Sequence, residues 1–330
     1  MKSQSDVIAF AMAHYDIEVF GVTQLTDKVF KLQSRHQDYL LKFSDDDAFV
    51  MKQLYAHKEM PGHVLPIYET RSGANVAKVE GGFAYLTDYI AQIPMPLEKR
   101  VAEYAELLGE LHIETALDVE QHDVEINDMY HETYQKLEAN FAMLEHYMSQ
   151  IEVKIARSPF EWYVMMVYPL LYGMYRRADD AMQKFYRGLS RRKQLPVAMT
   201  HGDVNAANIL PSTKASYLIN FEKSHFDVPA RDMILFLNHY HQLPGVRNMV
   251  TNYLKEQKNP LVVHDFFMRT LCVDLGSVFD GIAQNSLLDI SILNERIAPG
   301  MVAMQIYDEL NAPKKPEKTS ATQKKNEKKN

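Results

Sequence analysis

The sequence lacks features that would indicate several classes of protein. Only one cysteine, Cys272, occurs among 330 residues, so an intramolecular disulfide is excluded and a reducing compartment is expected. No apolar run is long enough to span a bilayer, and the run from Val7 to Ala13 is too short for a secretory signal. We therefore expect a chain that is neither secreted nor membrane-spanning.

Charge is distributed unevenly along the chain. Residues 313–330 carry seven Lys and two Glu, a balance of +5, so the total of −7 leaves −12 on the remainder. An acidic body argues against nucleic acid as the main ligand. The Lys-rich tail, 312–330, has almost no apolar residues and is expected to be disordered. It would serve either as a solubilising tail or as an electrostatic tether to an acidic partner.

The first ninety residues predict a small lobe rich in β-strands. Strand-like runs are separated by turn-forming residues and cover 18–25, 28–33, 38–43, 65–70 and 83–90. A helix is expected from the acidic triplet at 45–47 to about Glu59, because carboxylates at a helix start complement its dipole.

Beyond a hinge at 88–96 the pattern becomes helical. Apolar residues recur at spacings of three and four between Leu97 and Leu111, and a further helix is expected at 128–150. Ser158-Pro159 with Glu161 forms a capping box that starts a long helix. The predicted division is a β-rich lobe (1–90), a helical lobe (91–311) and the tail (312–330).

The most informative stretch is HGDVNAANIL at 201–210, followed by YLINFE at 217–222. Asp203 lies five residues before Asn208, and Asn220 follows twelve residues later on an expected strand. This layout is typical of a kinase catalytic loop and its metal-binding strand. We expect Asp203 to orient or deprotonate an acceptor hydroxyl, Asn208 to bind the Mg²⁺ of ATP, and His201 to shape the turn.

Asn220 stands where a metal-binding aspartate is expected. Its amide oxygen can bind Mg²⁺, but the missing charge should weaken metal binding by about 2–4 kcal/mol. Glu222 is expected on the same face of the strand, where it either compensates in part for that charge or lies at the surface as an ordinary carboxylate.

Three further residues are candidates for nucleotide binding. Lys42 ends the third strand-like run, from which it can reach the ATP phosphates. Asp88 and Tyr89, at the start of the expected hinge, are predicted to contact the nucleotide. The acidic partner of Lys42 stays open among Asp46, Asp47 and Glu59.

Asp232 is a candidate for supporting the loop. It follows the metal strand by twelve residues, in the run DVPARD at 227–232. A buried carboxylate there would accept hydrogen bonds from the loop backbone and hold it rigid. The alternative is a surface ion pair with Arg231.

Together these residues resemble the aminoglycoside phosphotransferase and choline kinase-like superfamily, whose loop and strand read roughly HGDxxxxNxL and IDFE. A closer resemblance is to the CotS-type spore-coat-associated kinase-like proteins, in the YutH-like branch. It rests on the loop, FEKSHFDVPARDM, the Ser-Pro-Phe start at 158–160 and LGELH at 108–112, and spans about residues 15–305. Asn220, Asn205 and Ala207 replace the family's usual Asp, His and Gly.

The resemblance implies an α+β, bilobal protein-kinase-like fold of the aminoglycoside phosphotransferase type, with an ATP/Mg²⁺ cleft between the lobes. It also implies a place in the mother-cell cytoplasm or on the spore coat. Two hypotheses follow. The first is a phosphotransferase acting on a small-molecule hydroxyl. The second is a pseudokinase that serves as an assembly or scaffold protein among spore coat proteins, motivated by Asn220.

Overall fold

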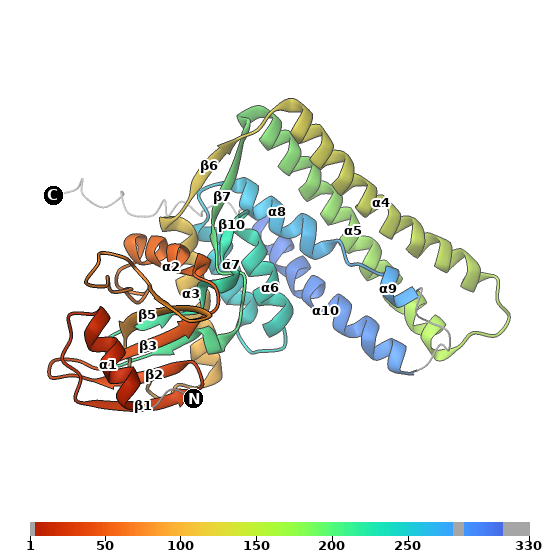
Figure 1. Cartoon of the computed structure of the whole chain (residues 1–330). Coiled ribbons are helices and arrows are strands. Elements are labelled where there is room, and N and C mark those ends of the chain that lie inside the picture. The colour runs from red at the N-terminus through yellow and green to blue at the C-terminus, as the bar shows by residue number, and fades with distance from the viewer. Residues whose placement is uncertain (1–3, 280–286, 313–330) are drawn as a thin grey trace, which may run out of the picture.

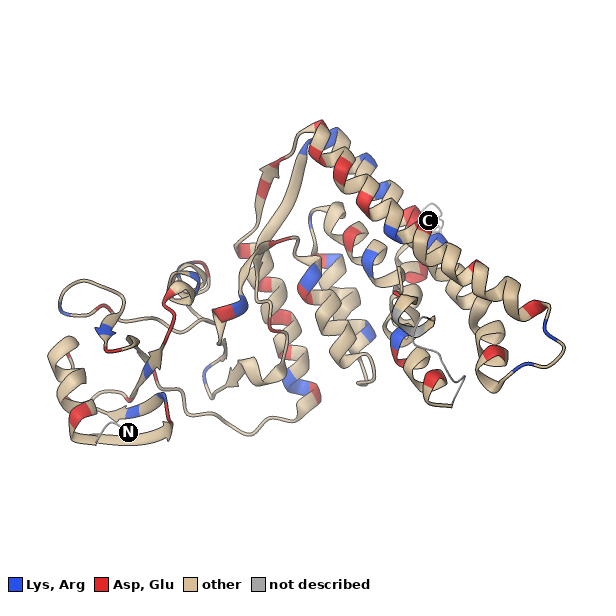
Figure 2. Cartoon of the chain, turned by 45° about the vertical axis from the view of Figure 1, so that its right-hand side comes forward, with Lys and Arg blue, Asp and Glu red and all other residues tan. Residues whose placement is uncertain are grey.

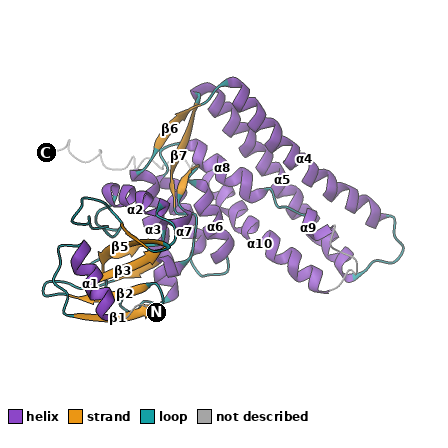
Figure 3. Ribbon diagram, viewed as in Figure 1, coloured by secondary structure: helices purple, strands orange, loops and turns teal. Residues whose placement is uncertain are grey.

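Two lobes of different composition make up the protein, as seen in a computed structural model that describes residues 4–279 and 287–312 (Figure 1). Strands gather in the N-terminal lobe and helices make up most of the C-terminal lobe (Figure 3). This is the bilobal α+β arrangement expected from the sequence. The Lys-rich segment 313–330 lies outside the described residues.

The N-terminal lobe is built on one antiparallel sheet of order β1-β2-β3-β5-β4. Its strands are β1 (Gly21–Thr26), β2 (Val29–Gln33), β3 (Tyr39–Ser44), β4 (Ala77–Val79) and β5 (Gly82–Asp88). The predicted strand at 65–70 is wrong: only an isolated bridge between Tyr68 and Leu86 forms there, and β4 takes the edge of the sheet instead.

Each face of this sheet is covered by a helix. Helix α1 (Gln4–His14), which the sequence reasoning missed, packs Val7 and Ala11 against Leu41 and Leu86. Helix α2 (Ala48–Glu59), close to its predicted bounds, covers the opposite face near Tyr85. Because strand side chains alternate between faces, Leu41 enters the α1 core and Lys42 points to the α2 side.

The C-terminal lobe packs its helices around one large apolar core. The helices are α3 (Leu97–Glu114), α4 (Asp123–Glu152), α5 (Pro159–Arg192), α6 (Ala230–Tyr240), α7 (Val246–Glu256), α8 (Pro260–Leu271), α9 (Gly276–Phe279) and α10 (Leu287–Leu310). Helices α4 and α5 form a long hairpin that projects from the body (Figure 1). Acidic residues recur along α4, while Lys and Arg recur towards the end of α5 (Figure 2).

Helix α5 begins as the sequence predicts. The Ser158 hydroxyl accepts a hydrogen bond from the Glu161 amide at 3.2 Å, and the Glu161 carboxylate accepts one from the Ser158 amide at 2.7 Å. These bonds satisfy amides that a helix start leaves free. No helix in the described part of the chain is long and apolar enough to cross a membrane.

Short strands connect the helical core to the junction of the lobes. Strand β7 (Gln194–Thr200) lies between β6 (Leu117–Glu120) and β10 (His225–Asp227), and β8 (Ile209–Pro211) pairs with β9 (Ser216–Leu218). Two 3₁₀ turns, η1 (Ala206–Asn208) and η2 (Phe221–Lys223), lie beside these strands. The loop from 201 to 208 therefore starts from a paired strand in the middle of a small sheet.

Candidate active site

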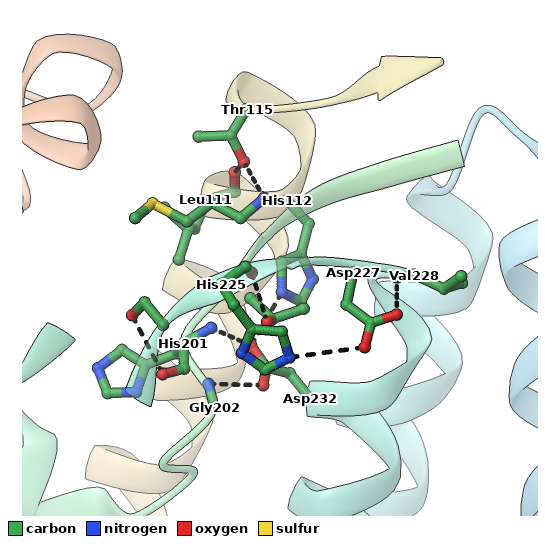
Figure 4. A network of polar contacts seen from close by, with 12 residues as sticks. Leu111, His112, Thr115, His201, Gly202, His225, Asp227, Val228 and Asp232 are labelled. Atoms are coloured by element: carbon green, nitrogen blue, oxygen red, sulfur yellow. Dashed lines mark hydrogen bonds and ion pairs between the residues drawn. The ribbon is translucent and has the colours of Figure 1, made fainter. Parts of the chain in front are cut away.

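A buried carboxylate, Asp232 on α6, braces the start of the loop at 201–208. Its Oδ2 accepts a hydrogen bond from the His201 amide at 2.6 Å and its Oδ1 accepts one from the Gly202 amide at 3.0 Å. The ring of His112 on α3 contacts the same carboxylate at 3.1 Å (Figure 4). Arg231 instead pairs with Asp227.

The charge on Asp232 is stabilised despite its burial. Burial alone would raise its pKa, but the hydrogen bonds from His112 and from the two loop amides outweigh burial and hold the pKa below its ordinary value. His112 in turn contacts the Tyr253 hydroxyl at 2.8 Å. The sequence reasoning missed His112 and Tyr253 as supports. The LGELH run at 108–112 could have indicated His112, whereas no sequence pattern indicated Tyr253.

The turn itself requires glycine at position 202. Gly202 has φ +74°, and a Cβ built there would lie 2.4 Å from the Lys223 carbonyl oxygen. His201 beside it is buried, which lowers the pKa of its imidazole. Its Nε2 lies 2.8 Å from the Ile219 carbonyl oxygen, so the ring links the loop to the strand that follows. This geometry agrees with a structural role for His201.

Asp203 presents its carboxylate at the junction of the lobes, with a side chain 41% exposed. Lys223 donates to Oδ1 at 3.0 Å and the Asn208 amide nitrogen donates to Oδ2 at 3.2 Å. The hydrogen bond from Lys223, aided by the one from Asn208, lowers the pKa of Asp203. Asp203 is therefore an ionised carboxylate that a small molecule can reach.

Asn208 and Asn220 contact each other directly. The Asn208 side chain donates to the Asp203 carbonyl at 2.8 Å, and its Oδ1 accepts a hydrogen bond from the Asn220 amide nitrogen at 2.8 Å. The backbone of Asn220 lies in the left-handed region, with φ +66°, and strand β9 ends before it, at Leu218. Glu222 consequently lies in the 3₁₀ turn η2, so the expected same-face strand geometry is wrong.

The side chains expected to bind a divalent cation contact each other in this structure. The Asn208 oxygen expected to bind Mg²⁺ accepts a hydrogen bond from Asn220, and Asp203 Oδ1 accepts one from Lys223. Within residues 4–279 and 287–312, no group of three or more His, Cys, Asp or Glu side chains is arranged to hold a metal ion. Of the oxygens expected to bind metal, that of Asn208 thus accepts a hydrogen bond from the protein itself.

Lys42 lies on the α2 side of the sheet, with its ammonium 5.9 Å from the centre of the Tyr85 ring. Burial lowers its pKa, and the carboxylate of Glu222 partly opposes that effect. Within the described part of the chain, no acidic side chain of helix α2 pairs with Lys42. Instead, its Lys52 donates to the Glu222 carbonyl oxygen at 2.9 Å, so α2 is tied to η2.

Asp88 and Tyr89 lie where β5 ends and the chain passes to the C-terminal lobe. The Asp88 carboxylate accepts hydrogen bonds from the Tyr68 hydroxyl at 2.7 Å and from Gln37 at 3.0 Å. The Tyr89 amide donates to the Asp38 carbonyl at 3.0 Å. These contacts brace the connection between the lobes, and nucleotide binding by either residue stays a prediction.

A cavity of about 780 Å³ opens on the helical side of the loop. It lies between α4, α5, α6 and α8, and the loop contributes Gly202 to its wall. Apolar residues such as Leu137 and Met182 line much of it, together with the cationic groups of Lys136, Arg231 and Arg269. A cavity of this size suits a small molecule with both apolar and anionic or hydroxylated parts.

One solved structure shares this fold, and others are similar to the chain over most of its length. The chain is similar to an aminoglycoside phosphotransferase from Alicyclobacillus acidocaldarius, with a TM-score of 0.56 and 13% identity over 94% of this chain and 96% of the other. A spectinomycin phosphotransferase in its AMP-bound complex gives a TM-score of 0.49 and 12% identity over 93% of this chain and 98% of that one. An amicoumacin kinase gives a TM-score of 0.47 and 14% identity over 93% of this chain and 94% of that one.

The first of these similarities shows that the chain shares the bilobal fold of that aminoglycoside phosphotransferase. At 13% identity it shows the fold alone. No family model and no curated protein sequence matches the chain.

Proposed function

We propose that this protein binds ATP between its lobes and transfers a phosphoryl group to a hydroxyl of a small molecule. The observation that carries the proposal is Asp203: an ionised, accessible carboxylate on a loop braced by a buried Asp232. Phosphoryl transfer depends mainly on positioning and electrostatics, and a rigid loop serves both. The resemblance to small-molecule kinases in loop sequence supports the same reading.

In the proposed reaction the hydroxyl oxygen of the acceptor faces Asp203, and the rest of the acceptor extends past Gly202 towards the cavity. That oxygen forms a bond to the γ-phosphorus, the bond from this phosphorus to the bridging oxygen breaks, and ADP leaves. Asp203 takes the hydroxyl proton. The ammonium of Lys42 offsets phosphate charge in the cleft. No step of this proposal passes through magnesium, and its two expected ligands, Asn208 and Asn220, hydrogen-bond to each other in this structure.

The test is an ADP-release assay with a panel of hydroxylated metabolites, run with the wild-type protein and with Asp203→Ala. The proposal requires at least one acceptor for which the wild-type protein turns over faster than the variant by about 100-fold or more. Asp203→Asn is the matched control, since it keeps the shape and the Asn208 contact but removes the base. Equal turnover by all three proteins across the panel would remove the enzyme hypothesis.

A second candidate function is a pseudokinase scaffold within the spore coat, and the bond between Asn208 and Asn220 favours it. The resemblance to CotS-type proteins supports placing it in the mother-cell cytoplasm or on the coat. A strain lacking the protein would be complemented with wild-type or Asp203→Ala protein, and its coat examined by electron microscopy. Full complementation by the variant favours the scaffold, whereas failure of a folded variant favours the enzyme.

A further inference from the structure

The hydrogen bonds around Asn220 fix which way each amide points. The Asp203 carbonyl and carboxylate can only accept, so the nitrogen of the Asn208 side chain must face them. The Asn208 oxygen then faces Asn220, whose nitrogen donates a hydrogen bond to it at 2.8 Å. This contact fills the position in which a cation would otherwise join an oxygen of residue 208 to one of residue 220.

Positive charge at the loop comes from side chains. Lys223 contacts Asp203 Oδ1 at 3.0 Å, and Lys52 from the other lobe reaches the Glu222 carbonyl oxygen at 2.9 Å. Both contacts converge on the segment that follows Asn220. An ammonium beside a carboxylate supplies one positive charge without requiring several oxygen ligands.

We propose that Asn220 and Lys223 together replace a divalent cation in this protein. The Asn220 amide closes the position between the loop and the strand, and the Lys223 ammonium neutralises Asp203. The loop is thus assembled without metal. The loop would then accept a nucleoside triphosphate that carries no bound metal. This choice of ligand rests on the proposed function. The metal independence of the loop itself does not rest on it.

The critical substitution is Asn220→Asp. A carboxylate at 220 would place an oxygen against the Asn208 oxygen, so two acceptors would face each other with no proton between them. The variant loses one hydrogen bond and gains an acidic group next to Asp203. Its melting temperature in EDTA should fall by about 2–4 °C. Millimolar Mg²⁺ or Mn²⁺ should restore it, because a cation can bridge the facing oxygens.

The experiment compares melting temperatures of the wild-type protein, Asn220→Asp and Asn259→Asp in EDTA, Mg²⁺ and Mn²⁺ without nucleotide. Asn259 caps α8 by accepting from the Leu261 amide at 3.1 Å, and aspartate keeps that cap. Asn259→Asp therefore adds the same negative charge as Asn220→Asp, but it does so away from the loop and does not place that charge against an acceptor there. We expect a metal-dependent rise for Asn220→Asp alone. A rise for the wild-type protein, or none for Asn220→Asp, would overturn the proposal.

A second arm adds ATP, in EDTA or in Mg²⁺, to the wild-type protein. Equal stabilisation by ATP in both supports metal-free nucleotide binding, and a shift seen only with Mg²⁺ contradicts it. No shift in either would reject the proposed nucleotide function, while the nucleotide-free arm would still decide whether the loop needs metal. If Asn220→Asp does not fold, calorimetric titration of Mn²⁺ into the wild-type protein decides instead: measurable uptake at the loop, absent in Asp203→Asn, overturns the proposal.

Discussion

Replacing Asp232 with asparagine should destabilise the whole protein and not only its loop. The carboxylate is 1% exposed and receives hydrogen bonds from the amides of His201 and Gly202 and from His112. Asparagine keeps one acceptor oxygen but turns an N–H₂ group towards a donor. Hydrogen bonds to a charged group contribute about 1.5–3 kcal/mol each, so we expect a loss of about 3–5 kcal/mol in the free energy of unfolding.

The destabilisation caused by Asp232→Asn should become smaller as the pH falls. The pKa of Asp232 in the folded protein lies below its ordinary value. Its carboxylate therefore stabilises the fold fully above the unfolded pKa of about 3.9, and this contribution is lost as pH falls through the folded pKa. The gap between the wild-type protein and Asp232→Asn should be constant from about pH 7 to 5 and should narrow below about pH 4.

Urea denaturation at a series of pH values measures this gap. Asp308→Asn is the control, because Asp308 forms a surface pair with Arg177 at 2.8 Å, and a pair of that kind contributes about 0–1 kcal/mol. The reasoning would be refuted if Asp232→Asn were no more destabilising than the control, or if its gap widened on acidification.

Three further predictions concern the loop and the cavity. Gly202→Ala should lose about 2 kcal/mol or more in urea denaturation, because the positive φ and the nearby Lys223 carbonyl exclude a Cβ; wild-type stability would contradict this. Lys223→Ala should raise the pKa of Asp203 towards its ordinary value in a ¹³C NMR titration, since Lys223 is the main cause of the lowered value; an unchanged pKa would refute that cause. Lys136→Gln should raise KM for an anionic acceptor several-fold at unchanged stability, and an unchanged KM would argue against acceptor binding in the cavity.

Several elements were predictable because their causes are local. The capping box at Ser158 and Glu161 lies within one helical turn. The acidic triplet before α2 marks its start, and the alternation around Leu41 and Lys42 marks a strand. The spacing from Asp203 to Asn208 is likewise a property of one short loop. Each of these patterns involves residues no more than a few positions apart.

Other features depended on partners far away in the sequence. Helix α1 was missed because its short apolar run gains stability only by covering the sheet, where Tyr15 just beyond it bonds to the Ala84 carbonyl at 3.2 Å. The pattern at 65–70 predicts a strand, but only Tyr68 in this segment forms a bridge to the sheet. A sequence pattern cannot show which strand will occupy an edge.

The sequence by itself determined the order of the lobes, the bounds of several helices and the presence of a loop with Asp203 and Asn208. Only the tertiary structure decided which groups Asn220 and Lys223 contact. The Asn220 nitrogen donates to the Asn208 oxygen, and the acceptor-only oxygens of Asp203 set the orientation of the Asn208 amide. A hydrogen bond between side chains has a direction, and direction arises only when the fold brings donor and acceptor together.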